Sequence, residues 1–256
     1  MFLRRRFGEK LFDEILSDDR KKEPTCSAVI VAAGNSTRMG DDKLFMQLGE
    51  MPVLVRTLLA FEKCCAVEEI IVVTRSDKLE EVADMCKKYG ISKTSKVIIG
   101  GRTRVESSLA GVSEVKQDAR VIAIHDGARP LIDAETIENC VEAAVHYLAA
   151  APAVPCTDTL KAIDAKGYAI GTVDRSTTLR IQTPQVFQAD LIKGALTRAV
   201  EKELPITDDC SAVEAMGVKI FMVEGSEDNI KLTTARDMMI AKAILDSREE
   251  KVESGK

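Results

Sequence analysis

Short apolar runs alternate with segments of helical spacing along most of the chain. Runs rich in valine, isoleucine and alanine occupy residues 27–33, 69–74, 96–99, 120–124 and 218–223, and a strand cut short by prolines is expected over 151–155. Near-continuous apolar strands are typical of a parallel sheet that helices cover on both faces. The intervening segments show helical periodicity over 51–65, 79–89, 103–115, 135–149, 189–201, 208–216 and 234–246. This alternation predicts a doubly wound α/β fold with a mostly parallel sheet flanked by helices.

Residues 156–184 depart from this rhythm. They are rich in threonine, aspartate and glycine, and they hold two short strand-like pieces, 160–163 and 168–173, on either side of an expected turn at 164–167. Turn residues between two extended pieces favour a hairpin. We therefore expect a β-hairpin arm at about 156–184 that projects from a single domain spanning 25–246.

The two ends of the chain differ from this domain in composition. Residues 1–24 place apolar side chains at helical spacing among charges of both signs, which predicts an amphipathic extension. It is interpreted either as a helix packed on the main body or on a partner subunit, or as an extension without function. Residues 247–256 are expected to form a frayed polar tail.

Composition limits the classes of function. The 256 residues carry a formal net charge of −5, and aromatic residues make up 4% with no tryptophan. A mildly acidic chain has no whole-molecule attraction for nucleic acid, and it offers few rings for stacking bases. No apolar run approaches the roughly 18 residues that a membrane helix needs. Seven cysteines without any C-x-x-C pair favour reduced, buried thiols in a cytoplasmic protein.

The first candidate site follows the first strand. Ala32, Ala33 and Gly34 are small enough for a ligand to approach the backbone, whose N–H groups would bind phosphate oxygens. Arg38 and Lys43 would neutralise charge on those oxygens. The spacing matches neither the P-loop nor the dinucleotide fingerprint, which argues against an NAD-linked oxidoreductase, and an ordinary glycine-containing turn is the alternative.

A second cluster follows the fourth strand, where Asp126 is placed to help hold Mg²⁺ together with substrate phosphates. The alternative is that Asp126 and Arg129 form a pair that braces a turn. His125 is interpreted as a structural residue. Ligands of open α/β sheets bind beyond the carboxyl ends of the strands, so both clusters lie where a site is expected.

Two further clusters lie later in the chain. Thr159 and Arg175 flank the proposed hairpin, where cations would hold a phosphorylated substrate, and exposed charges are the alternative. Thr207 begins a helical segment and Lys231 follows the last strand. The alternatives are that Thr207 or Asp208 is a helix N-cap and that Lys231 is one more surface lysine.

Taken together, the clusters resemble the 2-C-methyl-D-erythritol 4-phosphate cytidylyltransferase family of non-mevalonate isoprenoid synthesis. The matching segments occur in the family's order: AAGNSTRMG, GGRTRVESS, IHDGARPLI, VPCTDTLK, VDRS, TPQVF, TDDCSAVE and VEGSEDNIKLTT. The resemblance implies a GT-A-like nucleotidyltransferase fold, a homodimer joined through the hairpin arm, CTP as donor, a polyol phosphate as acceptor and Mg²⁺ as cofactor.

The resemblance also implies roles for single residues. Arg38 and Lys43 would stabilise the transition state, and Asp126 would be associated with the metal. Residues implied to contact the cytosine and ribose are Gly101, Arg104 and Ser107. Residues implied to hold the methylerythritol phosphate are Thr159, Arg175, Thr207 and Lys231, and Arg129 is implied to bind substrate beside Asp126. Only residues 39–42 separate Arg38 from Lys43, fewer than the family commonly has.

Two other functions stay open on the sequence. A ribitol 5-phosphate cytidylyltransferase would share the fold, CTP and most motifs. A non-catalytic nucleotide-binding module would keep the fold but not the chemistry.

Overall fold

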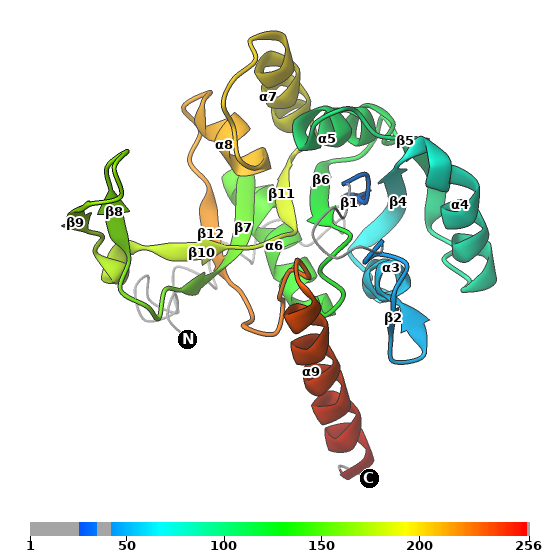
Figure 1. Ribbon diagram of the computed structural model, residues 1–256. Coiled ribbons are helices and arrows are strands. Elements are labelled where there is room, and N and C mark those ends of the chain that lie inside the picture. Colours follow the sequence, from blue (N-terminus) through cyan, green and yellow to red (C-terminus); the bar gives the residue numbers. More distant parts are fainter. Residues whose placement is uncertain (1–25, 35–41, 255–256) are drawn as a thin grey trace.

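The computed structural model describes residues 26–34 and 42–254. Its centre is an eight-stranded sheet in the order β10-β7-β11-β6-β1-β4-β5, with β12 also paired to β7 (Figure 1). The strands are β1 (Cys26–Val31), β4 (Val67–Thr74), β5 (Thr94–Ile99), β6 (Val121–Asp126), β7 (Ala149–Pro155), β10 (Leu179–Ile181), β11 (Gln185–Gln188) and β12 (Phe221–Glu224). β1 runs parallel to β4 and β6, whereas β11 runs antiparallel to β6 and β7. The predicted mostly parallel sheet is confirmed.

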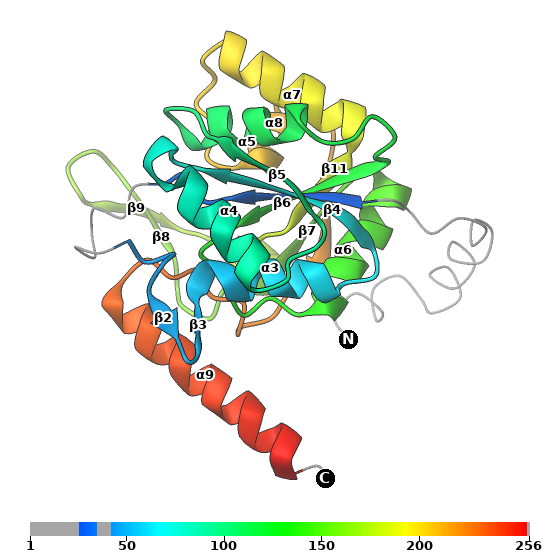
Figure 2. The same cartoon turned by 90° about the vertical axis from the view of Figure 1, so that its right-hand side faces the viewer.

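Helices cover both faces of the sheet (Figure 2). One face packs on α5 (Arg104–Ser113), α7 (Ala189–Glu201) and α8 (Asp209–Glu214). The other packs on α3 (Val53–Lys63), α4 (Leu79–Lys88) and α6 (Ala134–Tyr147), with the first turns of α9 (Ala235–Ser254) against the same core. Because side chains of a strand alternate between faces, Val29 and Ile71 enter one core while Ile30 and Val72 enter the other.

The arm is a hairpin, as predicted, but it is shorter than 156–184, because β10 (Leu179–Ile181) pairs with β7 in the main sheet. Strands β8 (Lys161–Ile163) and β9 (Ala169–Thr172) pair antiparallel and project from the body (Figure 1). The turn between them is closed by the Asp164 N–H, which donates to Tyr168 O at 2.9 Å. Apolar side chains on the arm are exposed, among them Ile163 and Ile170 at 64% and 68%.

Several boundaries differ from the sequence prediction. The expected strand 218–223 begins later, at Phe221. The expected strand 151–155 begins earlier, at Ala149, and continues through Pro152, whose carbonyl accepts the Gln182 N–H at 2.8 Å. The predicted frayed tail is wrong for residues 247–254, because α9 continues to Ser254. Arg248 fixes this extension: its Nη2 lies 2.9 Å from Asp228 Oδ2, and its Nη1 donates to Leu131 O at 3.1 Å.

A two-stranded ribbon leads from the first candidate loop into the body. Its strands are β2 (Gln47–Leu48) and β3 (Met51–Pro52), and α3 follows directly.

The predicted extension over 1–24 lies outside the described residues. Within 26–34 and 42–254, no helix has the length and apolar character needed to cross a membrane. All seven cysteines are free thiols and five are buried, whereas Cys65 is exposed.

Candidate active site

A cavity of about 500 Å³ lies at the carboxyl ends of the parallel strands. Val31, the last residue of β1, is paired with Val73 on β4 and with Asp126 on β6, so the three strand ends meet at one edge of the sheet. Nine residues singled out in the sequence line this cavity: Ala32, Ala33, Gly34, Lys43, Gly101, Arg104, Ser107, Asp126 and Lys231. The prediction that distant clusters meet at the strand ends is confirmed for these nine.

The turn between β5 and α5 needs its two glycines. A Cβ on Gly100 would lie 2.6 Å from the Ala33 Cβ, and one on Gly101 would lie 2.2 Å from the Glu106 Cβ. Both distances are shorter than carbon atoms tolerate, so only glycine lets this turn pack against the end of β1. Ser107 holds the turn, since its Oγ accepts the Gly101 N–H at 3.1 Å and donates to Thr103 O at 2.9 Å. Ser107 thus shapes the cavity wall.

Asp126 is the central anion of the site. Lys231 Nζ lies 2.8 Å from its Oδ2, Arg104 Nη2 lies 3.3 Å from its Oδ1, and Arg129 Nε lies 3.7 Å from Oδ2. Burial alone would raise the pKa of the Asp126 carboxyl, but the charges of Arg104 and Lys231 outweigh burial and hold that pKa well below its usual range. Asp126 is therefore a carboxylate at neutral pH, and it gathers three cations.

Behind Asp126 lies a buried polar layer that positions it. The Asp126 N–H donates to Thr183 Oγ1 at 3.1 Å, and that hydroxyl also lies 3.0 Å from His125 Nδ1. His125 is fully buried, and its Nε2 lies 3.2 Å from Arg129 O. Burial lowers the pKa of His125 to about 3, so its ring is neutral. The interpretation of His125 as structural is confirmed.

Arg129 lies beside this layer and does not line the cavity. Its Nη1 donates to the backbone carbonyl of Asn229 at 2.7 Å. Asn229 is itself fully buried, and its Nδ2 donates to Thr183 O at 2.9 Å. Arg129 therefore ties β6 to the segment that carries Lys231, in agreement with the bracing alternative.

Asp209 belongs to the polar cluster Thr207-Asp208-Asp209, in which only Thr207 was predicted to bind substrate. Asp209 begins α8, is fully buried, and places Oδ2 2.7 Å from Arg104 Nη2. Burial would lower the pKa of Arg104, but the charges of Asp209 and Asp126 outweigh burial and raise it. Arg104 is thus held charged between two carboxylates. The pair Asp208-Asp209 was the available signal, but an acid at the first helical position is also a common partner of the helix dipole.

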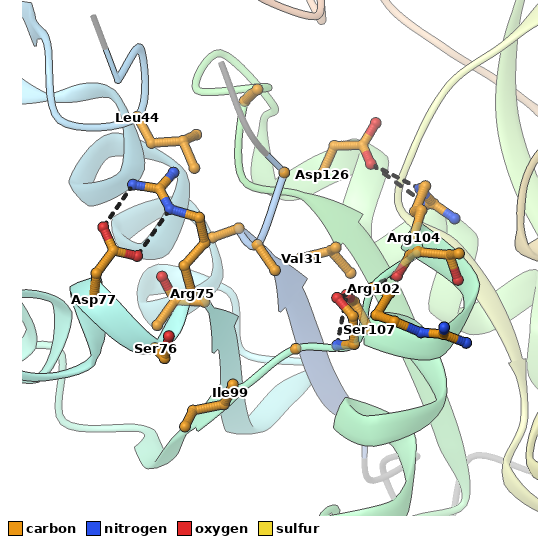
Figure 3. Close-up of a pocket in the computed structure, with 18 of the residues that line it drawn as sticks. Val31, Leu44, Arg75, Ser76, Asp77, Ile99, Arg102, Arg104, Ser107 and Asp126 are labelled. Atoms are coloured by element: carbon orange, nitrogen blue, oxygen red, sulfur yellow. Dashed lines mark hydrogen bonds and ion pairs between the residues drawn. The ribbon is translucent and has the colours of Figure 1, made fainter. Parts of the chain in front are cut away.

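Arg75 was also missed. It is the first residue after β4, it lines the cavity, and its Nε lies 3.1 Å from Asp77 Oδ1 (Figure 3). Its Nη2 lies 2.6 Å from Asp42 Oδ2. An arginine directly after a β-strand was a detectable signal, but Asp42, one of its two carboxylate partners, lies 33 positions earlier in the chain.

Three predicted residues besides Arg129 do not line the cavity: Thr159, Arg175 and Thr207. Thr159 and Arg175 are exposed at the base of the arm, where Arg175 Nη1 donates to Thr157 O at 3.3 Å. Thr207 is exposed before α8, whose N-cap is Asp208 within a capping box, as the N-cap alternative anticipated. Arg38 lies outside the described residues.

The residues present suit a Mg²⁺ ion that draws most of its ligands from a substrate. Among residues 26–34 and 42–254 there is no cluster of three or more His, Cys, Asp or Glu side chains that would bind a metal unaided. Mg²⁺ commonly binds through one or two carboxylates together with substrate phosphates. Asp126, a deprotonated carboxylate on the cavity wall, is a donor of this kind.

The fold and the cavity define a nucleotide-binding α/β protein of the nucleotidyltransferase class, in which a glycine-rich turn and converging cations face one pocket. The model of the IspD family, 2-C-methyl-D-erythritol 4-phosphate cytidylyltransferase, matches residues 26–247. The chain belongs to this family.

Known relatives agree with this assignment. The enzyme of that name from Caldanaerobacter subterraneus is 42% identical over 222 residues, which cover 86% of this chain and 98% of the relative. The one from Halalkalibacterium halodurans is 39% identical over 88% of this chain and 99% of its own length. The crystal structure of 4-diphosphocytidyl-2C-methyl-D-erythritol synthase from Anaerococcus prevotii superposes with a TM-score of 0.79 at 31% identity, covering 88% of this chain and 97% of that one.

Proposed function

We propose that this protein transfers CMP from CTP to 2-C-methyl-D-erythritol 4-phosphate, releasing pyrophosphate and forming 4-diphosphocytidyl-2-C-methyl-D-erythritol. The observation that carries the proposal is the convergence of Lys43, Arg104 and Lys231 on one cavity beside the Gly100-Gly101 turn. Such a cavity suits two anionic substrates that must approach each other. The relatives that share nearly the full length of the domain bear the name of this activity.

The reaction needs no general base. A phosphate oxygen of the acceptor attacks the α-phosphorus of CTP in line, a new P–O bond forms, and the bond to the β-phosphate breaks with its electron pair leaving on pyrophosphate. The attacking phosphate is already anionic at neutral pH. His125, the one histidine near the cavity, is buried and neutral with both ring nitrogens in hydrogen-bonding contact, so it takes no proton in this step.

Catalysis then depends on alignment and on charge stabilisation. Lys43 lines the cavity on the side of the β1 loop, where its ammonium would stabilise negative charge that builds up on the α-phosphate. Arg38 would act with it. Lys231, which also lines the cavity and contacts Asp126 at 2.8 Å, would bind the acceptor phosphate.

Asp126 would hold Mg²⁺ together with the CTP phosphates. When bound, the ion would neutralise charge on the triphosphate and favour departure of pyrophosphate. Arg104 contacts the same carboxylate at 3.3 Å, so it keeps Asp126 ionised and fixed at the cavity wall.

We further propose a homodimer in the cytoplasm. Thr159 and Arg175 are exposed on the arm, away from the cavity of their own chain. Exposed apolar side chains on the same arm, such as Ile163 and Ile170, suit burial against a second copy. That arrangement would bring the arm residues of one copy to the acceptor site of the other. The free thiols suit a reducing compartment.

Pyrophosphate release tests the proposed function. The purified protein is incubated with CTP, Mg²⁺ and either 2-C-methyl-D-erythritol 4-phosphate or ribitol 5-phosphate, and the product is identified by its mass. We expect the diphosphocytidyl product with the first acceptor. Turnover of ribitol 5-phosphate alone would make this a ribitol 5-phosphate cytidylyltransferase, and CTP binding without turnover of either acceptor would indicate a non-catalytic nucleotide-binding module.

A further inference from the structure

Two contacts tie the loop around Lys43 to the segment that follows β4. On one side of Lys43, Asp42 Oδ2 lies 2.6 Å from Arg75 Nη2. On the other side, the Phe45 ring lies under the ammonium of Lys78, with 4.6 Å between Nζ and the ring centroid. The Phe45 N–H also donates to Asp42 O at 2.9 Å, which closes the loop into a turn. Lys43 is therefore carried on a turn with fixed ends.

Arg75 is itself fixed in two directions. Its Nε and Nη2 face Asp77 at 3.1 and 3.4 Å, while Nη2 also reaches Asp42 (Figure 3 shows the Asp77 contact). The preceding residue, Thr74, is buried in β4, and its carbonyl accepts the Gly100 N–H at 2.8 Å. The guanidinium thus starts from a rigid strand end and bridges two carboxylates.

Arg75 lines the cavity, but two carboxylates, those of Asp42 and Asp77, contact its Nε and Nη2. The side chains of Arg75 and Asp42 are only 20% and 18% exposed, so solvent and salt weaken their attraction less than they weaken that of a surface pair. The pair is therefore suited to hold the loop.

We propose that the Arg75–Asp42 ion pair positions Lys43 for the reaction, so that Arg75 and Asp42 are positioning residues and neither touches the substrate. This inference rests on the proposed function. Arginine is required because its planar fork reaches two carboxylates together, whereas a lysine ammonium is a point charge that reproduces only part of this contact. Loss of the pair would leave Lys43 present but displaced.

A kinetic double-mutant cycle tests the inference with Arg75→Gln, Asp42→Asn and the double variant. Displacing a catalytic group by about 1 Å costs up to about 100-fold, so we expect each single variant to lower kcat about 10- to 100-fold. The KM for CTP should change less than about 3-fold, since binding contacts remain. The double variant should be no slower than the slower single variant, because both remove the same contact.

Two matched variants complete the set. Arg75→Lys should recover less than half of the kcat that Arg75→Gln loses, because one ammonium does not span both carboxylates. Glu114→Gln breaks an ion pair of similar length, 2.7 Å to Lys96, which lies away from the cavity. It should leave kcat unchanged. Unfolding midpoints of all variants establish that each is folded at the assay temperature.

Amide hydrogen exchange gives a second readout that needs no turnover. The Phe45 N–H, which donates to Asp42 O, should exchange faster in Arg75→Gln and Asp42→Asn than in the unaltered protein and in Glu114→Gln. If the unaltered protein does not transfer CMP, the proposed function fails. Even then, a Phe45 N–H that exchanges slowly in the unaltered protein and faster in these two variants supports the ion pair as the anchor of the loop.

Three results would overturn the inference when the unaltered protein is active. The first is a kcat within about 2-fold of normal in both single variants. The second is independent effects that multiply in the double variant. The third is a raised KM for CTP at unchanged kcat, which would make Arg75 a nucleotide-binding residue. Unchanged Phe45 exchange would likewise contradict the anchoring role.

Discussion

His125 makes stability depend on pH well above the range in which carboxylates titrate. The ring is fully buried on β6, 4.9 Å from the Phe61 ring centroid, with its nitrogens 3.0 Å from Thr183 Oγ1 and 3.2 Å from Arg129 O. Burial lowers its pKa to about 3 from the usual 6.5. The folded protein therefore keeps this histidine neutral where the unfolded chain protonates it.

The sign and size of this pH dependence follow from the linkage between protonation and folding. As pH falls through 6.5, the unfolded state gains a proton that the folded state does not accept until about pH 3, so stability is complete above pH 6.5 and declines below it. Each unit of pH below 6.5 costs about 1.4 kcal/mol, or about 2 kcal/mol at pH 5. Asp126, whose pKa is lowered, adds its own loss only at pH values near and below the usual aspartate pKa, about 4. The interval from pH 5 to 7 therefore isolates histidine.

Urea unfolding at pH 7 and pH 5 measures this effect. The sequence contains two histidines, so His125→Asn and His146→Gln separate them fully. The free energy of unfolding of the unaltered protein should fall by about 2 kcal/mol between the two pH values, His146→Gln should retain that fall, and His125→Asn should lose it. An equal fall in His125→Asn, or none in the unaltered protein, would refute the buried neutral histidine.

Four further predictions concern the site and the arm. Lys43→Ala should lower kcat by roughly 10²–10³, as loss of one charge-stabilising group does, and steady-state kinetics with near-normal kcat would remove Lys43 from the chemistry. Arg175→Ala should chiefly raise the KM for the acceptor phosphate, and an unchanged KM would contradict its role. Asp209→Asn should cost about 3 kcal/mol in urea unfolding, because it uncouples a buried ion pair; a loss near zero would show that Asp126 alone satisfies Arg104. Ile170→Glu on the arm should yield monomers in analytical ultracentrifugation, whereas an unchanged dimer would place the interface elsewhere.

Much of the fold follows from local pattern. β1 and β4 are buried on both faces, so their apolar runs are nearly continuous, and their short length and many β-branched residues favour strands over helices. β7 is harder to predict because it contains Pro152, which donates no hydrogen bond. It remains a strand because the Pro152 carbonyl still accepts the Gln182 N–H and because β12 pairs along it. These partners are far away in the sequence.

The antiparallel strands β10 and β11 were not anticipated for the same reason. They are three and four residues long, and their pairing with β7 and β6 makes them strands.

The end of α9 was predicted to be irregular but is helical. Residues 247–254 are polar, but several are good helix formers, and Arg248 anchors them to Asp228. Polarity alone suggested a frayed tail, whereas this tertiary contact holds residues 247–254 in the helix.

The site was predictable wherever strand ends determine it. Asp126 and Lys43 follow from the rule that ligands bind at the carboxyl ends of parallel strands. Arg75, which directly follows β4, meets the same rule, but its ion pair with Asp42 spans 33 positions of the sequence. Asp209 lies at the start of a helix, and its ion pair with Arg104 spans 105 positions. Such pairs leave no periodic trace in the sequence.

The ratio of kcat/KM for two acceptors, at saturating CTP and Mg²⁺, tests the proposed function most directly. Pyrophosphate release is followed with 2-C-methyl-D-erythritol 4-phosphate and, side by side, with ribitol 5-phosphate. We expect a kcat/KM for the methylerythritol phosphate that clearly exceeds that for ribitol 5-phosphate. An equal or lower value, or no release with either acceptor, would contradict the proposed function.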